Sequence, residues 1–162
     1  MMEAIVAVYA DWGIGRGGTQ PVVVRADRRR FREVTGSSAV IVGRRTLADF
    51  PGGRPLPGRH NIVLTRQEGL IVPGAEVVRT PEEAAAAGAL HERCFVIGGA
   101  SVYTALFPHL TRVYVTKLDV CPESDSFFPD LDADPAWICT DEGSPQEENG
   151  ISYRFCVYER IN

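Results

Sequence analysis

The sequence predicts an α/β protein with a central, mostly parallel sheet of about eight strands, four flanking helices and a C-terminal antiparallel hairpin. Two observations carry this prediction. Short apolar runs alternate with helix-like segments along most of the chain, and the last two apolar runs are joined by a polar connection with no helix between them. We expect one domain over residues 1–162, because no stretch resembles a linker between domains.

The strands are expected at the apolar runs. The first run, residues 4–10, is apolar on both faces and should therefore lie in the centre of the sheet. The others are residues 38–42, 60–65, 75–79, 93–97, 112–118, 137–141 and 151–159. The last two should pair around the polar loop 142–150.

The helices are expected over residues 25–35, from about Arg44, over 80–90 and over 101–107. The third has the clearest start: Thr80 can cap it, Pro81 suits the first helical position, and acidic residues occupy the first turn.

Composition limits the classes of function. The chain has a formal net charge of −4 and is 44% hydrophobic, which argues against a dedicated nucleic-acid or anionic-membrane binder. We find no stretch long enough to span a membrane and no signal peptide. The four cysteines form no CxxC pair and have no metal-ligand spacing with histidine. We therefore expect a cytoplasmic protein with free thiols and no metal.

The helix at 25–35 carries a carboxylate on its apolar side. Asp27, Phe31 and Val34 share one face, and Arg25, Arg29 and Arg32 point the opposite way. Asp27 could cap the helix or form a salt bridge, or it could be a half-buried group that binds N–H donors of a ligand. The arginine cluster is best interpreted as a solvated face.

The segment 43–61 is rich in groups that bind anions, with four arginines, four glycines and three prolines. Gly43 ends a strand before a helix, as does the pair Gly98-Gly99, and such junctions expose backbone N–H groups to phosphates. Thr65-Arg66 and Arg79 end the next two strands, on the same expected edge of the sheet. A plain tight turn is the alternative at each glycine. Together they indicate a dinucleotide with an extra phosphate, and Arg59 suits a carboxylate.

In this order the motifs resemble dihydrofolate reductase, most closely its single-domain bacterial members. The most specific are Trp12-Gly13-Ile14-Gly15, Gly43-Arg44-x-Thr46, the block from Gly53 to Asn61, Val96-Ile97-Gly98-Gly99-x-x-Val102-Tyr103, and Asp125-Ser126-x-Phe128-Pro129. The resemblance covers nearly the whole chain. It implies NADPH-dependent reduction of 7,8-dihydrofolate to tetrahydrofolate, for one-carbon and thymidylate metabolism, by a monomer that antifolates inhibit.

The resemblance also implies roles for individual residues. Asp27, assisted by Thr116, would be the catalytic acid of the pterin pocket. The substrate would contact Ile5, Ala7, Arg28, Phe31, Phe50, Arg54, Leu56, Arg59, Ile97 and Tyr103. NADPH would contact Ala7, Ile14, Gly43, Arg44, Arg45, Thr46, Leu64, Thr65, Arg66, Arg79, Ile97, Gly98, Gly99, Ala100, Ser101, Val102, Tyr103 and Ser126. A cis peptide is expected between Gly98 and Gly99, and a mobile loop over residues 12–24 should close over the nicotinamide.

The sequence departs from the family pattern at three positions. Val22 stands where an aromatic residue, commonly tryptophan, is usual; Arg28 replaces an apolar residue; and Ala100 replaces a third glycine. Two other functions stay open: a riboflavin-pathway NADPH reductase with the same sheet, and a non-catalytic binding module that kept the fold. Asp27, Arg59 and Thr116 together weigh against the second.

Overall fold

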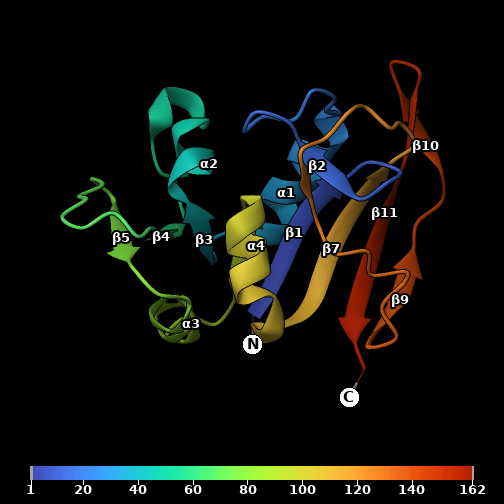
Figure 1. The fold of residues 1–162 in the computed structure, drawn as a ribbon. Helices are drawn as coiled ribbons and strands as arrows, with labels where there is room; N and C mark the ends of the chain where they lie inside the picture. The colour runs from blue at the N-terminus through green and yellow to red at the C-terminus, as the bar shows by residue number, and fades with distance from the viewer. Residues whose placement is uncertain (1, 162) are drawn as a thin grey trace.

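The structure, a computed structural model, describes residues 2–161 and is organised around one nine-stranded sheet (Figure 1). Its strands are β1 (Met2–Val8), β3 (Ala39–Gly43), β4 (His60–Leu64), β5 (Ala75–Val78), β6 (Cys94–Gly98), β7 (Leu110–Leu118), β9 (Trp137–Glu142), β10 (Gln146–Glu148) and β11 (Ile151–Arg160). The helices are α1 (Arg25–Thr35), α2 (Arg44–Ala48), α3 (Pro81–Ala89) and α4 (Ala100–Leu106), with short 3₁₀ turns at Pro51–Gly53 and Phe107–His109.

The strand order is β10-β11-β7-β1-β6-β3-β4-β5. β10 pairs with residues 151–153 of β11, and β9 pairs with residues 156–160 of the same strand. The six strands from β7 to β5 are mutually parallel, whereas β9, β10 and β11 are antiparallel to their neighbours. The predicted fold class and C-terminal hairpin are thus confirmed, and β1, buried at every position, lies in the interior of the sheet as expected.

Alternate residues of the strands face two different layers. Ala4, Val6 and Val8 of β1 belong to a core with α3 and α4, represented by Ala84 and Leu106. On the other face, residues of β1, β3 and β6 pack with α1 and α2. Figure 1 shows α4 in front of the sheet and α1 behind it. Because successive residues of a strand point to opposite faces, α1 and its residue Asp27 lie on the face of the sheet opposite α3 and α4.

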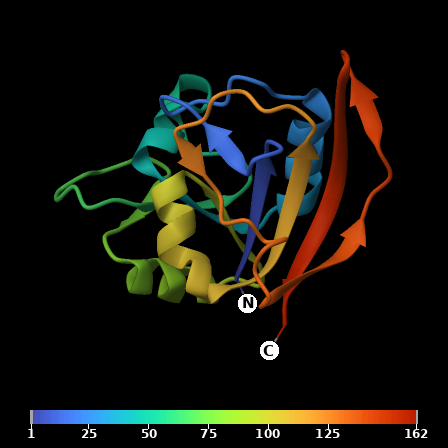
Figure 2. The same cartoon turned by 45° about the vertical axis from the view of Figure 1, so that its right-hand side comes forward.

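Three short strands were not predicted. The polar connection 142–150 contains β10, which pairs with β11 beside the hairpin. A second, two-stranded sheet joins β2 (Gly13–Gly15) to β8 (Ser126–Phe127). Figure 2 shows these two segments side by side, above the end of β1 that is remote from the N-terminus. Strands of two or three residues are too short to show the alternation of apolar and polar residues that predicts a strand.

The helix starts differ in how they are capped. Thr80 accepts a hydrogen bond from the Glu83 N–H at 3.0 Å, as predicted for α3. In α1, Val24 is the cap residue and the carboxylate comes from β10: Glu148 accepts from the N–H groups of Arg25 and Ala26. Asp27 is therefore not the cap of its own helix. Within residues 2–161, no helix combines the length and apolar character that crossing a bilayer requires.

Candidate active site

A half-buried carboxylate and a buried hydroxyl meet between α1 and β7. Thr116 Oγ1 donates a 2.6 Å hydrogen bond to Asp27 Oδ1. Thr116 is 1% exposed, and its register partner on β1 is Ala7, near the carboxyl end of that strand. The two predicted catalytic residues, 89 positions apart in sequence, are thus brought into direct contact.

The surroundings of Asp27 oppose its ionisation only in part. Burial raises the pKa of Asp27, whereas the hydrogen bond from Thr116 and the charges of Arg30 and Arg28 lower it. A carboxylate held between these influences can accept two N–H donors from a ligand and stabilise positive charge on it.

Five predicted substrate residues form one apolar cluster, named the slot below, in which Phe31 follows Asp27 by four residues on α1. Ile5 and Ile97 are buried, and Phe31, Phe50 and Leu56 are partly buried in this cluster. They come from β1, β6, α1 and the connection after α2, so these five predicted residues do meet. Tyr103 belongs to the core on the other face, and its hydroxyl donates to the Ile5 carbonyl at 2.7 Å.

Arg59 lies at the rim of the slot. Its Nε donates to Thr35 Oγ1 and its Nη1 to the Pro57 carbonyl, both at 2.9 Å, and its guanidinium lies 5.8 Å from the centre of the Phe31 ring. Burial, reinforced by the charge of Arg32, lowers the pKa of Arg59. One terminal nitrogen, Nη2, is left for a carboxylate.

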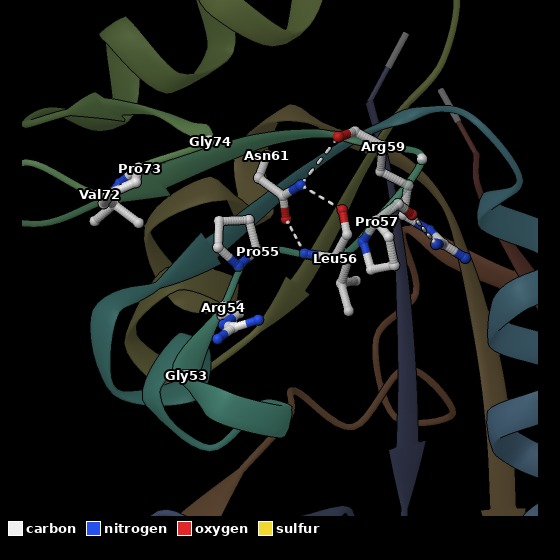
Figure 3. A pocket seen from close by; sticks show the side chains of 11 residues that line it. Gly53, Arg54, Pro55, Leu56, Pro57, Arg59, Asn61, Val72, Pro73 and Gly74 are labelled. Atoms are coloured by element: carbon white, nitrogen blue, oxygen red, sulfur yellow. Dashed lines mark hydrogen bonds between the residues drawn. The ribbon is translucent and has the colours of Figure 1, made fainter.

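The connection that presents Arg59 borders an open cavity of about 550 Å³, which Arg54 also lines (Figure 3). Asn61 of β4 holds this connection in place. Figure 3 shows its side chain bonded to the backbone of Leu56 and Arg59: Oδ1 accepts from the Leu56 N–H, and Nδ2 donates to both carbonyls. The apolar Leu56 and cationic Arg59 are thereby fixed on one rigid turn.

The ends of β3 and β6 form a cradle of backbone. The Gly98–Gly99 peptide is cis, as predicted. A Cβ on Gly99 would come within 2.9 Å of Thr46 Oγ1, and one on Gly43 within 2.9 Å of Val102 Cγ2. The two glycine junctions are therefore in contact with each other and leave room only for glycine. Such close-packed positions without a side chain, beside backbone N–H groups, fit the pyrophosphate of a dinucleotide.

Further predicted cofactor residues lie along the same sheet edge. Thr65 and Arg66 follow β4, and Arg79 follows β5, which are the next two strands in order. Arg44, Arg45 and Arg66 are exposed, whereas Arg79 forms an ion pair with Glu68 at 3.4 Å. Arg44 and Arg45 line a second open cavity of about 490 Å³, opposite Gly17, Gly18 and Thr19. These three residues belong to the loop over residues 12–24, named the glycine-rich loop below. Leu64 instead packs toward the α3 side.

The glycine-rich loop is bound to the structure at both ends. Ile14 and Ser126 lie in the β2–β8 pair, and the Gly17 N–H donates to Asp125 at 3.0 Å. At the other end, Gln20 Nε2 donates to the Ala7 carbonyl at 3.1 Å. The Tyr9 hydroxyl donates to the Val22 carbonyl at 2.8 Å and accepts from its N–H at 3.0 Å. The loop thus reaches the end of β1 beside the site.

Several supporting residues were missed at the sequence level. Tyr9, Gln20 and Asn61 act through backbone contacts that spacing does not reveal. Arg30 was not singled out within the arginine cluster, which was interpreted mostly as a solvated face; it is half-buried and contacts β7 and β11. Its position three residues after Asp27 was a usable signal, since that spacing puts both on one helix face.

Two predicted substrate residues have exposed side chains. Arg28 is exposed on α1 and Arg54 is exposed before the Leu56 turn. Ala100 and Ser101 open α4 directly after the cis peptide, with Ser101 exposed.

Comparison with known proteins agrees with this geometry. Residues 1–160 match the protein family described as dihydrofolate reductase. The chain is 35% identical to the dihydrofolate reductase of Bacillus subtilis, covering 100% of this chain and 96% of the relative. It is 38% identical to that of Mycobacterium tuberculosis, covering 99% and 98%.

A solved structure of dihydrofolate reductase from Enterococcus faecalis, complexed with NADP(H) and RAB-propyl, superposes with a TM-score of 0.90 at 29% identity. The match covers 100% of this chain and 97% of that one. Sequence and structural similarity therefore extend over the full length of the described fold. The chain belongs to the dihydrofolate reductase family.

Proposed function

We propose that this enzyme reduces 7,8-dihydrofolate to 5,6,7,8-tetrahydrofolate with NADPH, and that Asp27 is the group that recognises the pterin. The observation that carries the proposal is the half-buried Asp27 carboxylate, which lies 2.6 Å from the Thr116 hydroxyl and four residues before Phe31 of the apolar slot. The slot suits a flat aromatic ligand, and the carboxylate suits the paired N–H donors of a pterin ring.

Asp27 acts on the ligand electrostatically. Thr116 occupies one lone pair of Oδ1, and the rest of the carboxylate can accept from N3 and the 2-amino group of dihydrofolate. Its negative charge favours the protonated, electrophilic imine at N5 and C6. Tyr103 is not the proton donor, because its hydroxyl is used by the Ile5 carbonyl and burial raises its pKa. The proton reaches N5 through water.

The residues at the strand ends would hold the cofactor. Gly43, Thr46, Gly98 and Gly99 form the close backbone cradle, and Arg44, Thr65 and Arg66 lie where a 2′-phosphate would be held. Bound NADPH supplies the hydride that C6 accepts. The loop that Gln20 and Tyr9 fasten to β1 would cover the nicotinamide end and exclude water.

Arg59 would bind the α-carboxylate of the glutamate moiety. It is held on the turn fixed by Asn61, above the Phe31 ring, with Nη2 free of the hydrogen bonds that Nε and Nη1 make. Antifolates would occupy the same slot.

The test is NADPH oxidation, followed by its near-ultraviolet absorbance, with dihydrofolate as substrate. Dihydrofolate-dependent oxidation is expected, and Asp27→Asn should lower the rate at neutral pH by about 10²- to 10³-fold. Turnover of an oxidised ribosylaminopyrimidine, with none of dihydrofolate, would instead favour the riboflavin-pathway reductase. Nucleotide or folate binding without turnover of either substrate would favour the binding module.

We further propose that residues 1–162 form a single domain, acting as a cytoplasmic monomer without nucleic-acid partners. The unbroken sheet and the net charge of −4 support this. Light scattering coupled to gel filtration would reveal the mass in solution, and a dimer mass would contradict the monomer.

A further inference from the structure

Arg30 is a half-buried cation on the same face of α1 as Asp27, and its hydrogen bonds go only to uncharged groups. Its Nη1 donates to the Val115 carbonyl at 3.1 Å and its Nη2 to the Cys156 carbonyl at 3.2 Å. The guanidinium carbon lies 4.6 Å from the centre of the Phe155 ring and 5.6 Å from that of Tyr114. Within residues 2–161, the ion pairs include none that involves Arg30.

These contacts tie three elements together at one point. Val115 of β7 and Cys156 of β11 are register partners, and the guanidinium spans both from α1. Val115 directly precedes Thr116, the residue that donates to Asp27. The side chain of Arg30 therefore holds the stretch of β7 that carries the Thr116 hydroxyl against the helix that carries Asp27.

The charge of Arg30 has Asp27 as its principal electrostatic partner. Burial lowers the pKa of Arg30, and the largest opposing influence is the Asp27 carboxylate. In the reverse direction, Arg30 lowers the pKa of Asp27 more than exposed Arg28 does. A buried charge acts through a medium of low dielectric constant, so its influence is screened less than that of a surface arginine.

We propose that Arg30 is a positioning residue for the catalytic carboxylate: it fixes the Val115–Thr116 backbone against α1 and places a half-buried positive charge on the same helix face as Asp27. This proposal rests on the role of Asp27 proposed above. The aromatic faces of Tyr114 and Phe155 and the two carbonyls stabilise the cation in place.

Other ionisable groups also act on this pair. On α1, Arg28 faces Asp27, and on α4 the buried Tyr103 hydroxyl is influenced by it. Tyr114 of β7, Cys156 of β11 and Asp141 of β9 act on Arg30. Tyr103 and Cys156 both have pKa values raised by burial and remain neutral near pH 7. Arg28 is exposed and Arg30 is half-buried, so Arg30 is the less solvated cation of the two.

The test is an NMR titration of the Asp27 carboxyl in ligand-free protein labelled at aspartate, with Asp27→Asn identifying the signal. Arg30→Gln keeps an N–H donor and removes the charge; it should raise the titration midpoint by about 0.5 to 1 pH unit. Arg30→Lys keeps the charge, and its titration midpoint should lie close to that of wild type. Arg29→Gln, which removes an exposed arginine from the same helix, should not change it.

A lowered melting temperature for Arg30→Gln with an unmoved midpoint would overturn the proposal, because it would show a structural role alone. If Arg30→Gln does not fold, Arg30→Met, which preserves the aliphatic stem, replaces it with the same expected shift. The pH profile of single-turnover hydride transfer should move with the carboxyl midpoint. A moved midpoint with an unmoved profile would leave the action of Arg30 on Asp27 intact and contradict the proposed catalytic role of Asp27.

Discussion

Asp27 combines a functional requirement with a cost to the fold. It is half-buried, and within residues 2–161 only one of its oxygens accepts a hydrogen bond, from the Thr116 hydroxyl at 2.6 Å. A carboxylate left partly unpaired in an apolar slot is poorly solvated until a ligand arrives. Asp27 therefore makes the free energy of unfolding lower than an uncharged residue at this position would, as is common for binding sites.

We predict that Asp27→Asn is at least as stable as wild type at neutral pH. The pKa of Asp27 is raised above its ordinary value of 3.8 in the folded state. The stability that this group contributes is then fully present below the ordinary value and is lost as pH rises through the raised one. Urea denaturation at a series of pH values should show the unfolding free energy of the variant rising relative to that of wild type as the pH increases from the ordinary pKa to the raised one. A variant that loses stability relative to wild type as the pH rises would contradict the prediction.

Arg28 offers a prediction about ligand preference. It is exposed on α1 beside Asp27, where the family usually has an apolar residue. We expect it to reach the anionic glutamate tail alongside Arg59, so Arg28→Leu should raise KM for dihydrofolate by about 3- to 10-fold. The Ki of an uncharged antifolate should change less or fall. Arg29→Leu is the matched control. Unchanged KM and Ki in Arg28→Leu would contradict the idea.

At the scale of elements, the glycine-rich loop is held by contacts at its far end. The Tyr9 hydroxyl both donates to and accepts from the Val22 backbone, and Gln20 bonds to the Ala7 carbonyl. Val22 stands where the family commonly has tryptophan, so the backbone, rather than an aromatic side chain, provides the attachment here. Burial also raises the pKa of Tyr9, which keeps the hydroxyl a donor near neutral pH.

Tyr9→Phe should therefore loosen this loop. The loss of two hydrogen bonds to a partly buried backbone should cost about 1 to 2 kcal/mol of unfolding free energy. Amide hydrogen exchange over residues 20–24 should become faster, while exchange in β1 stays slow. Tyr153→Phe is the control, because its hydroxyl makes one long contact, 3.4 Å from Gln146. Equal exchange in the two variants would show that Tyr9 does not hold the loop.

At the scale of the whole molecule, the end of the sheet opposite the site is held by a buried acid. Glu3 is 1% exposed in β1, and Arg93 approaches both its oxygens, at 2.9 and 3.1 Å. Arg112 of β7 lies 3.5 Å away and also pairs with Glu159 of β11. This cluster links β1 to its neighbours where the parallel strands begin.

We predict that Glu3→Gln lowers the unfolding free energy by about 1.5 to 3 kcal/mol, because the partly exposed Arg93 and Arg112 lose the buried, charged acceptor to which they bind. KM values should stay near those of wild type, since the ligand site lies at the carboxyl ends of the strands. Denaturant unfolding measures the first effect and steady-state kinetics the second. Glu123→Gln, which removes an exposed partner of Arg16, should not shift the unfolding midpoint. A similar midpoint in both variants would contradict the role of Glu3.

Much of the fold could be predicted because its signals are local. The apolar runs predicted the strands of the main sheet except β10, α1 was placed over residues 25–35, and the Thr80 cap was recognised. Elements of two or three residues escaped, because β2, β8 and β10 form only where a partner strand is supplied from elsewhere.

Asp27, Arg59 and the glycine junctions were singled out from local patterns, Thr116 was found through the resemblance to a family, and the structure added the contacts between them. The sequence by itself determined which residues are apolar, cationic or free to adopt a glycine conformation, and hence the order of strands and helices along the chain. Only the tertiary structure decided that Thr116 faces Asp27, that Glu148 caps α1 and that Arg30 bonds to the backbone of β7. The physical reason is that propensity and periodicity act over one turn or one strand. The partner of a buried polar group is chosen by the packing of the whole sheet, over separations of 85 residues or more in all three cases.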